Sequence, residues 1–136
     1  MLVGKSKLRN NTDKLVVSLL VALFVQCPIT WAASHSASYY TFKSCKREGT
    51  SGVWTASGER FNENDLTCAL RSRDFGGLYR VTNLKNGKSV VVRHNDYGPN
   101  KKLHAKGRII DLSRGAFLRL APLSDGVIPV KVERIK

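Results

Sequence analysis

The chain has 136 residues, and its 23 lysines and arginines outnumber its 10 aspartates and glutamates, which gives a net charge of +13 near neutral pH. This length allows one small domain and leaves no room for a second large one. A basic surface favours polyanionic partners, but the sequence has no recognition-helix pattern and no RNA-binding aromatic strand, so we expect no nucleic-acid partner. Its three histidines have no cysteine or histidine at metal-ligand spacing, so we expect neither a metal nor a cofactor.

The N-terminal segment has the features of an export signal. Basic residues among the first 14 positions precede an apolar run, residues 15–25. Thr30 and Ala32 then supply the small side chains that a cleavage site prefers. The run is too short to cross a hydrocarbon layer of about 30 Å as a helix, so we expect no stable membrane span. We predict a signal peptide over residues 1–32 and an exported, monomeric domain over residues 33–136, in the periplasm or cell envelope or secreted.

The cysteines fit this location. A lipid-modified N-terminus at Cys27 is disfavoured, because Gln26 stands where such sites need a small residue. Cys45 and Cys68 remain in a compartment where disulfides persist, and we predict that they form one. Closing this loop would stabilise the fold by about 3 kcal/mol. The alternative is a pair of buried thiols.

The first half of the expected domain contains one strong local signal, a β-hairpin in which apolar and β-branched residues flank an Asn-Gly turn at positions 86 and 87. Three consecutive valines in its second strand favour a strand with little solvated face. In chain order we expect a first strand within 34–44, a loop over 46–52, irregular chain over 53–70, and hairpin strands over 78–82 and 89–94.

The second half contributes short elements. Gly98 and Pro99 indicate a turn over 96–102, and Ser113 is a candidate N-cap. We expect a strand over 108–112, a helix over 114–120 that ends before Pro122, and a last strand over 127–135. Six short strands with one or two short helices in about a hundred residues predict an all-β protein, a small closed barrel.

Three blocks of sequence resemble a known family. Residues 55–61 read TASGERF, residues 92–99 read VRHNDYGP and residues 107–113 read GRIIDLS. They resemble the blocks TANGE, NDRGP and RIIDLS of the RlpA-like double-psi β-barrels, and the resemblance extends over about residues 37–135. It implies a six-stranded double-psi barrel that acts on the glycan strands of peptidoglycan.

The resemblance also implies a reaction. Characterised members of that family are lytic transglycosylases, which cleave between N-acetylmuramic acid (MurNAc) and N-acetylglucosamine (GlcNAc) without water and leave a 1,6-anhydro end. The more distant expansins share the barrel but loosen polysaccharide without hydrolysing it. The fold alone therefore does not decide the activity.

Asp96 is the first catalytic candidate. Glycosidic cleavage needs a proton for the leaving oxygen, which carboxyl groups supply in most such enzymes. Asp96 matches the aspartate of NDRGP, and the resemblance implies that it acts as general acid and then as base toward the O6 hydroxyl of MurNAc. The alternative is that Asp96 only caps the turn before Gly98.

Two further carboxyl groups are candidates. Glu59 matches the glutamate of TANGE and would raise the proton affinity of Asp96 or hold substrate; alternatively it is an exposed loop charge beside Arg60. Asp111 interrupts an apolar run, so it must be hydrogen-bonded or line a cleft. Expansin-like barrels place an important aspartate at the matching position, whereas the structural alternative is a carboxylate bonded to backbone amides.

Aromatic and cationic residues are the candidates for substrate binding. Aromatic rings can stack on sugars, although they are more often part of a core, and arginines can bind carboxylates or hydroxyls of a glycan. The predicted binding residues are Tyr40, Thr55, Arg93, Asn95, Tyr97 and Arg108, with Tyr39 and Trp54 as further candidate platforms.

Two departures from the family pattern leave the activity open. Leu70 stands where the family commonly has a histidine, and a leucine can neither relay a proton nor orient a carboxylate. Tyr97 replaces the arginine of NDRGP. The sequence is therefore compatible with a lytic transglycosylase and with a non-catalytic glycan-binding or wall-loosening module. A third interpretation is a basic protein that binds anionic polymers through charge alone.

Overall fold

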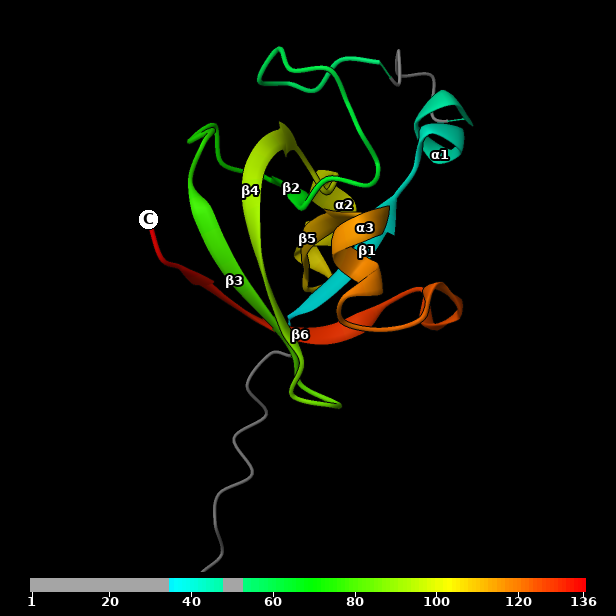
Figure 1. Cartoon of the computed structure of the whole chain (residues 1–136), viewed down its shortest axis with the longest axis vertical. Coiled ribbons are helices and arrows are strands. Elements are labelled where there is room, and N and C mark those ends of the chain that lie inside the picture. The colour runs from blue at the N-terminus through cyan, green and yellow to red at the C-terminus, as the bar shows by residue number, and fades with distance from the viewer. Residues whose placement is uncertain (1–34, 48–52) are drawn as a thin grey trace, which may run out of the picture. The chain divides into compact units, whose positions relative to one another are not determined.

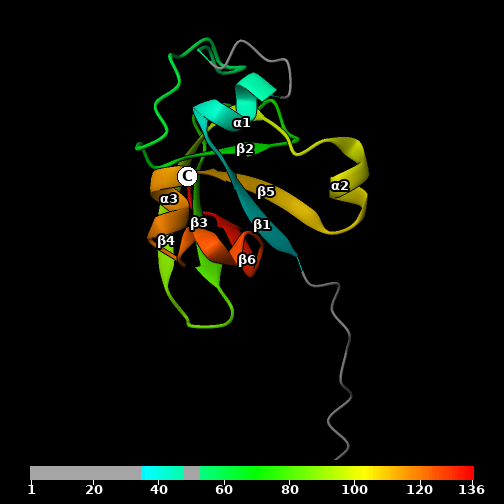
Figure 2. The same cartoon turned by 90° about the vertical axis from the view of Figure 1, so that its right-hand side faces the viewer.

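The computed structural model describes residues 35–47 and 53–136. Within these ranges six strands form a closed barrel in the order β1-β5-β2-β4-β3-β6, and β6 pairs back onto β1 (Figure 1, Figure 2). The strands are β1 (Ser36–Tyr40), β2 (Thr67–Leu70), β3 (Leu78–Asn83), β4 (Ser89–Tyr97), β5 (Arg108–Ser113) and β6 (Ile128–Arg134). The helices are α1 (Phe42–Arg47), α2 (Lys101–Ala105), α3 (Arg114–Leu118) and the 3-10 turn η1 (Leu123–Asp125). The expected all-β barrel is confirmed, with three short α-helices in the described ranges rather than one or two.

The predicted hairpin is confirmed as β3 and β4. The two strands pair antiparallel, and the backbone N–H of Asn83 donates to the carbonyl of Lys88 at 2.8 Å to close the turn. The expectation that β4 has little solvated face is wrong at Val91, which is 40% exposed. Val90 and Val92 on either side of it face the core, so β4 alternates in the ordinary way for a sheet with one wet face.

Three expectations for the connecting segments are wrong. The first strand is confirmed within 34–44, but the loop expected from residue 46 is helical at its start: α1 runs to Arg47, and it begins where the side chain of Thr41 accepts the N–H of Ser44 at 3.2 Å. The segment expected to be irregular up to residue 70 ends in β2, a short strand that depends on distant partners, β4 and β5. The turn expected over 96–102 is shorter, because α2 begins at Lys101, where Asn100 caps it by accepting the N–H of Leu103 at 2.9 Å.

The predicted cap at Ser113 is confirmed. Its side-chain oxygen accepts the N–H of Ala116 at 3.3 Å and starts α3, which buries Ala116 and Phe117 against the barrel. Phe117 contacts the ring of Tyr39 with centroids 4.9 Å apart, so Tyr39 belongs to the core side of β1. This packing covers one side of the barrel, and the apolar area that it removes from water stabilises the fold by about 25 cal/mol for each Å².

Residues 53–66, which lead into β2, lie at one end of the barrel (Figure 1, Figure 2). This segment carries the first of the three sequence blocks, and β4 delivers the second block to the same end. In residues 35–47 and 53–136, no helix combines the length and the apolar character that crossing a bilayer requires. The expected signal peptide and Cys27 lie outside the described residues.

Candidate active site

A β-bulge near the end of β4 organises the site. Cys68 pairs with His94 and the next residue of β2, Ala69, pairs with Asp96, so Asn95 is an extra residue on β4. A bulge of this kind changes the direction of the side chains that follow it. As a result Asn95 and Asp96, although consecutive, both bond to the same loop, residues 55–59.

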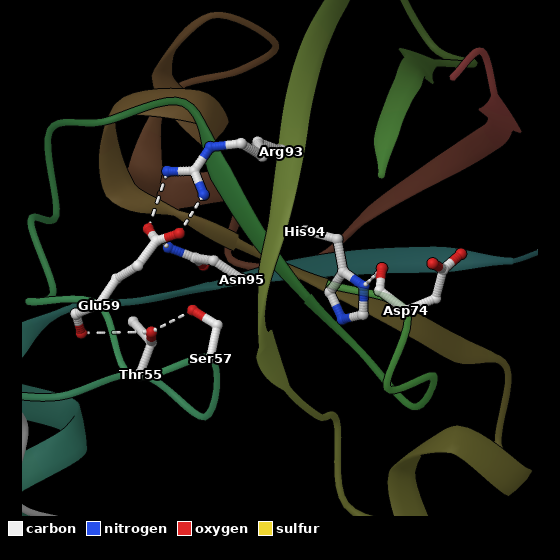
Figure 3. A network of polar contacts seen from close by, with 7 residues as sticks. All are labelled: Thr55, Ser57, Glu59, Asp74, Arg93, His94 and Asn95. Carbon is white, nitrogen blue, oxygen red and sulfur yellow. Dashed lines mark hydrogen bonds and ion pairs between the residues drawn. The ribbon is translucent and has the colours of Figure 1, made fainter. Parts of the chain in front are cut away.

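The loop over residues 55–59 is a tight turn docked on β4 (Figure 3). The backbone N–H of Thr55 donates to the carbonyl of Glu59 at 2.8 Å, and Gly58 adopts a φ of 87°, a conformation that glycine reaches without steric cost. The N–H of Ser57 donates to the carbonyl of Asn95 at 3.1 Å. The side chains of Thr55 and Ser57 bond to each other at 3.0 Å.

Glu59 and Arg93 form a two-pronged ion pair that fastens this loop to β4 (Figure 3). The second prong, from Nη2 of Arg93 to Oε2 of Glu59, measures 2.8 Å, and Nδ2 of Asn95 donates to the same oxygen at 3.2 Å. The hydrogen bond from Arg93 holds the pKa of Glu59 below its ordinary value, with Asn95 acting in the same direction. Glu59 is therefore a charged anchor of the loop, and its effect on the proton affinity of Asp96 stays a prediction.

The carboxylate of Asp96 is held by the backbone. Its Oδ1 accepts the N–H of Ala56 at 3.0 Å and the N–H of Tyr97 at 2.8 Å. No group in the described part of the chain bonds to Oδ2, and the residue is half-buried. One carboxyl oxygen thus fixes the orientation while the other is available to a ligand.

His94 supports the same strand from inside. It is fully buried, with Nδ1 2.9 Å from the carbonyl oxygen of Asp74 and Nε2 2.9 Å from the carbonyl oxygen of Asp96. Figure 3 shows the imidazole on the opposite side of β4 from the ion pair of Glu59 and Arg93. In the described ranges, no group of three or more histidine, cysteine, aspartate or glutamate side chains is arranged to hold a metal ion.

Tyr40 reaches the site from the end of β1. Its ring stacks on Phe61 with centroids 5.1 Å apart, and its hydroxyl is buried without a well-formed hydrogen bond to any described group, although Thr67 lies close by. Burial raises the pKa of Tyr40 far above its ordinary value, and the negative charge of Asp96 acts in the same direction. The phenol therefore stays neutral, with its hydroxyl near Asp96 and one ring face covered by Phe61.

Three further predicted residues line a separate pocket of about 460 Å³, called here the Asp111 pocket: Tyr97, Arg108 and Asp111. Asp111 is only 14% exposed in its side chain, and its Oδ1 lies 2.6 Å from Nε of Arg108. Asp111 is therefore both paired and at a cavity, as its apolar sequence neighbours demand. Tyr97 lines the same pocket, with the guanidinium groups of Arg71 and Arg73 each 5.4 Å from its ring centre.

The two groups of residues are neighbours across β2. Ala69 pairs with Asp96 of β4 on one side and with Asp111 of β5 on the other. Adjacent strands lie about 4.8 Å apart, so the two aspartates are carried about 10 Å apart at the backbone. The structure thus brings Thr55, Glu59, Arg93, Asn95 and Asp96 into one cluster, and Tyr97, Arg108 and Asp111 into the adjoining pocket.

Other predicted residues have simpler positions. Trp54 is 63% exposed beside the loop, which suits a sugar platform. Leu70 packs partly against the core at the end of β2. The structure contains no disulfide between Cys45 and Cys68; Cys68 is buried in the core and Cys45 is a half-buried residue of α1. Burial raises the pKa of the Cys68 thiol to about 12, so it is held as a thiol.

Several contributing residues were not predicted from sequence. Ala56 and Ser57 act through their backbone N–H groups, which residue identity does not reveal. Arg71 and Lys101 line the Asp111 pocket, but they lie 30 positions apart in sequence and only the pairing of β2 with β4 brings their segments together. The only hint in the sequence is that basic residues follow β2, at Arg71 and Arg73, and follow the second sequence block, at Lys101 and Lys102.

Comparison with known proteins identifies the family. A family model described as "Lytic transglycolase" matches residues 32–132. The chain is 48% identical over 97 residues to a probable endolytic peptidoglycan transglycosylase RlpA of Nostoc sp., a match that covers 71% of this chain and 24% of the relative. It is 38% identical over 122 residues to the corresponding protein of Treponema pallidum, covering 90% of this chain and 37% of the relative. The chain therefore spans well under half the length of these relatives.

Solved structures agree on the fold. The Streptomyces papain inhibitor superposes with a TM-score of 0.57 at 21% identity, covering 76% of this chain and 93% of the inhibitor. An expansin of Clavibacter michiganensis superposes with a TM-score of 0.54 at 21% identity, covering 75% of this chain and 49% of the expansin. These similarities show the barrel and leave the activity to the site. With a family model that matches most of its length and relatives approaching half identity, the chain belongs to the RlpA-like family of double-psi β-barrels, described as lytic transglycolases.

Proposed function

We propose that this protein is an endolytic peptidoglycan transglycosylase that cleaves between MurNAc and GlcNAc and leaves 1,6-anhydroMurNAc ends. The observation that carries the proposal is the carboxylate of Asp96, held through Oδ1 by two backbone N–H groups with Oδ2 left to a ligand. The relatives named as endolytic peptidoglycan transglycosylases support the same reaction.

Asp96 would serve the reaction in two steps. In its protonated form it gives a proton to the glycosidic oxygen as the bond from C1 of MurNAc to that oxygen breaks. The resulting carboxylate then takes the proton of the MurNAc O6 hydroxyl as O6 bonds to C1, which closes the 1,6-anhydro ring and restores the acid. No water enters, and Asp96 ends in the state in which it began.

The surrounding residues would position the aspartate and the sugar. The ion pair of Glu59 and Arg93 fastens the loop whose Ala56 N–H holds Asp96. Trp54 presents an exposed indole at the rim of that loop, where it can stack on a sugar ring. Preorganised positioning of this kind supplies a large part of the rate enhancement of an enzyme.

A second function, a non-catalytic glycan-binding or wall-loosening module, is favoured by Leu70. This residue occupies the position of the family's histidine and carries an aliphatic side chain that packs partly against the core. It cannot exchange a proton with a sugar or with Asp96. On this alternative the same surface binds glycan but leaves it intact.

We also propose that the protein is exported, that its signal peptide is removed, and that Cys45 and Cys68 then form a disulfide in the periplasm or outside the cell. An even pair of cysteines in a compartment where disulfides persist supports the pairing. Mass spectra of the protein isolated from the envelope, before and after reduction and alkylation, test it. Two alkylated cysteines before reduction would exclude the bond.

Incubation with purified sacculi separates the two functions. Mass spectrometry of the released fragments reports anhydroMurNAc ends, and sedimentation reports binding. Anhydro ends support the transglycosylase. Cosedimentation without anhydro ends supports the binding module and contradicts the enzymatic proposal.

A further inference from the structure

The Asp111 pocket carries more positive than negative charge. Of the described residues that line it, Arg71, Lys101 and Arg108 are cationic and Asp111 alone is acidic. Arg108 is paired with Asp111, with Nε 2.6 Å from Oδ1. Among residues 35–47 and 53–136, no acidic side chain forms an ion pair with Arg71 or Lys101. Two cations therefore border the cavity without a counterion among the described residues.

Arg71 is already oriented for a ligand. Its Nη1 donates to the carbonyl of Pro99 at 3.1 Å, and its guanidinium lies 5.4 Å from the ring centre of Tyr97. A guanidinium has five N–H donors, so most of them remain after the bond to Pro99 is made. Because Pro99 and Tyr97 already hold the planar guanidinium of Arg71, less conformational entropy is lost when it forms a bidentate bond to an anion.

The pocket begins one residue beyond Asp96. Tyr97 and Pro99 line it, and Ala69 pairs with both Asp96 and Asp111. A glycan strand held at Asp96 would therefore extend its substituents toward this pocket. Peptidoglycan carries carboxylates next to its sugar rings. They are the lactyl group of MurNAc where no peptide is attached, and the carboxylates of the stem peptide where one is.

We propose that the Asp111 pocket is a carboxylate-binding subsite for the glycan substrate, in which Arg71 and Lys101 bind the anion and Arg108 neutralises Asp111 beside it. The inference rests on the proposed function, because it takes peptidoglycan as the ligand. It adds to that function a specificity determinant, the guanidinium of Arg71, which Pro99 and Tyr97 hold in place.

The test measures binding of soluble glycan strands, with the full chain expressed and the protein isolated from the envelope fraction. Asp96→Asn protein is used throughout so that strands are not cleaved during the measurement. Three probes are compared: peptide-free strands, the same strands with their lactyl carboxylates amidated, and strands that retain stem peptides. The variants are Arg71→Gln and Lys101→Gln. The matched controls are Arg119→Gln and Lys102→Gln, which remove the same charges from exposed residues that do not line the pocket.

We expect Arg71→Gln and Lys101→Gln each to weaken binding of the carboxylate-bearing probe about fivefold or more, as loss of a charge-assisted hydrogen bond does. The controls should change it less than about twofold, as removal of an exposed charge does. An effect confined to peptide-free strands identifies the lactyl carboxylate, and an effect confined to peptide-bearing strands identifies the stem. Unchanged melting temperatures show that the variants fold, and Lys101→Gln alters only an exposed side chain.

Three results would overturn the subsite: equal losses in Lys101→Gln and Lys102→Gln, equal losses on amidated and unmodified strands, or no binding of any strand. The readout is independent of cleavage. If unmutated protein makes no anhydro ends while the carboxylate dependence holds, the enzymatic proposal fails and the subsite stands. If anhydro ends form but the carboxylate has no effect, the subsite alone fails.

Discussion

The backbone N–H of Ala56 donates a 3.0 Å hydrogen bond to Oδ1 of Asp96, across 40 positions of sequence. This bond makes the orientation of the carboxylate depend on where the loop over residues 55–59 sits. The loop in turn is fastened to β4 by Glu59 and by the N–H of Ser57. Changes in the loop that leave Asp96 itself intact should therefore still alter the reaction.

The ion pair of Glu59 and Arg93 should give the fold a pH-dependent contribution. Because the folded state lowers the pKa of Glu59 from 4.5, its contribution is complete above that value and is lost as the pH falls below it. Glu59→Gln should be less stable than the unmutated protein near neutral pH, by no more than about 1 kcal/mol because the pair is partly exposed. Thermal melts across the acid range measure the difference, which should shrink as the pH drops.

Arg93→Gln is the matched control for this prediction. It should cause a similar loss near neutral pH, and the double variant should lose little more than either single one, since both remove the same interaction. A stability difference that does not vary with pH would contradict the role given to the ion pair.

Tyr40→Phe should leave the protein as stable as before or slightly more so. The change removes a buried hydroxyl that has no well-formed hydrogen bond among the described residues, so the expected change in unfolding free energy is within about 1 kcal/mol. Phe61→Ala is the contrast: Phe61 is 5% exposed and contacts the rings of Tyr40 and Phe42, so its loss should cost about 3 kcal/mol. Denaturant titrations compare the two. A large loss in Tyr40→Phe would show that the hydroxyl is bonded.

Gly115→Ala should destabilise the start of α3. A Cβ at this position would lie 2.8 Å from the carbonyl carbon of Asn64, a backbone atom that cannot rotate away, and would strain the 2.8 Å bond from the Gly115 N–H to the carbonyl of Glu63. We expect a loss of about 1–3 kcal/mol in the free energy of unfolding. Gly98→Ala is the control, because its Cβ would meet the Cβ of Ala69 at 3.6 Å, an ordinary contact. Equal melting temperatures for the two variants would contradict the packing described at Asn64.

The features predicted correctly from sequence are those specified within a few residues. The hairpin of β3 and β4 depends on its own turn, and Ser113 caps a helix that begins at the next residue. β2 was missed because a four-residue strand has too few positions to show a period, and its pairing with β4 and β5 is set by the whole barrel. α2 was missed because a five-residue helix is too short to show a helical period, and because Gly98 and Pro99 just before it predict a turn.

In the candidate site, too, local features could be predicted from sequence and long-range contacts could not. The family resemblance located the aspartates and Glu59, since motif blocks are local. It did not show that Glu59 bonds Arg93, 34 positions away, or that a bulge at Asn95 turns two consecutive side chains toward one loop. It also did not reveal that Tyr97 contacts two arginines, because β2 and β4 pair only in the folded barrel.

The most direct test of the account is the yield of anhydroMurNAc ends from purified sacculi, measured by mass spectrometry for the unmutated protein and for Asp96→Asn. Asp125→Asn, which changes an exposed acid in η1, is the matched control. We predict anhydro ends from the unmutated protein and from Asp125→Asn, and a loss of at least about a hundredfold in Asp96→Asn, the contribution of a positioned general acid. Equal yields from Asp96→Asn and the unmutated protein would contradict the central role of this carboxylate.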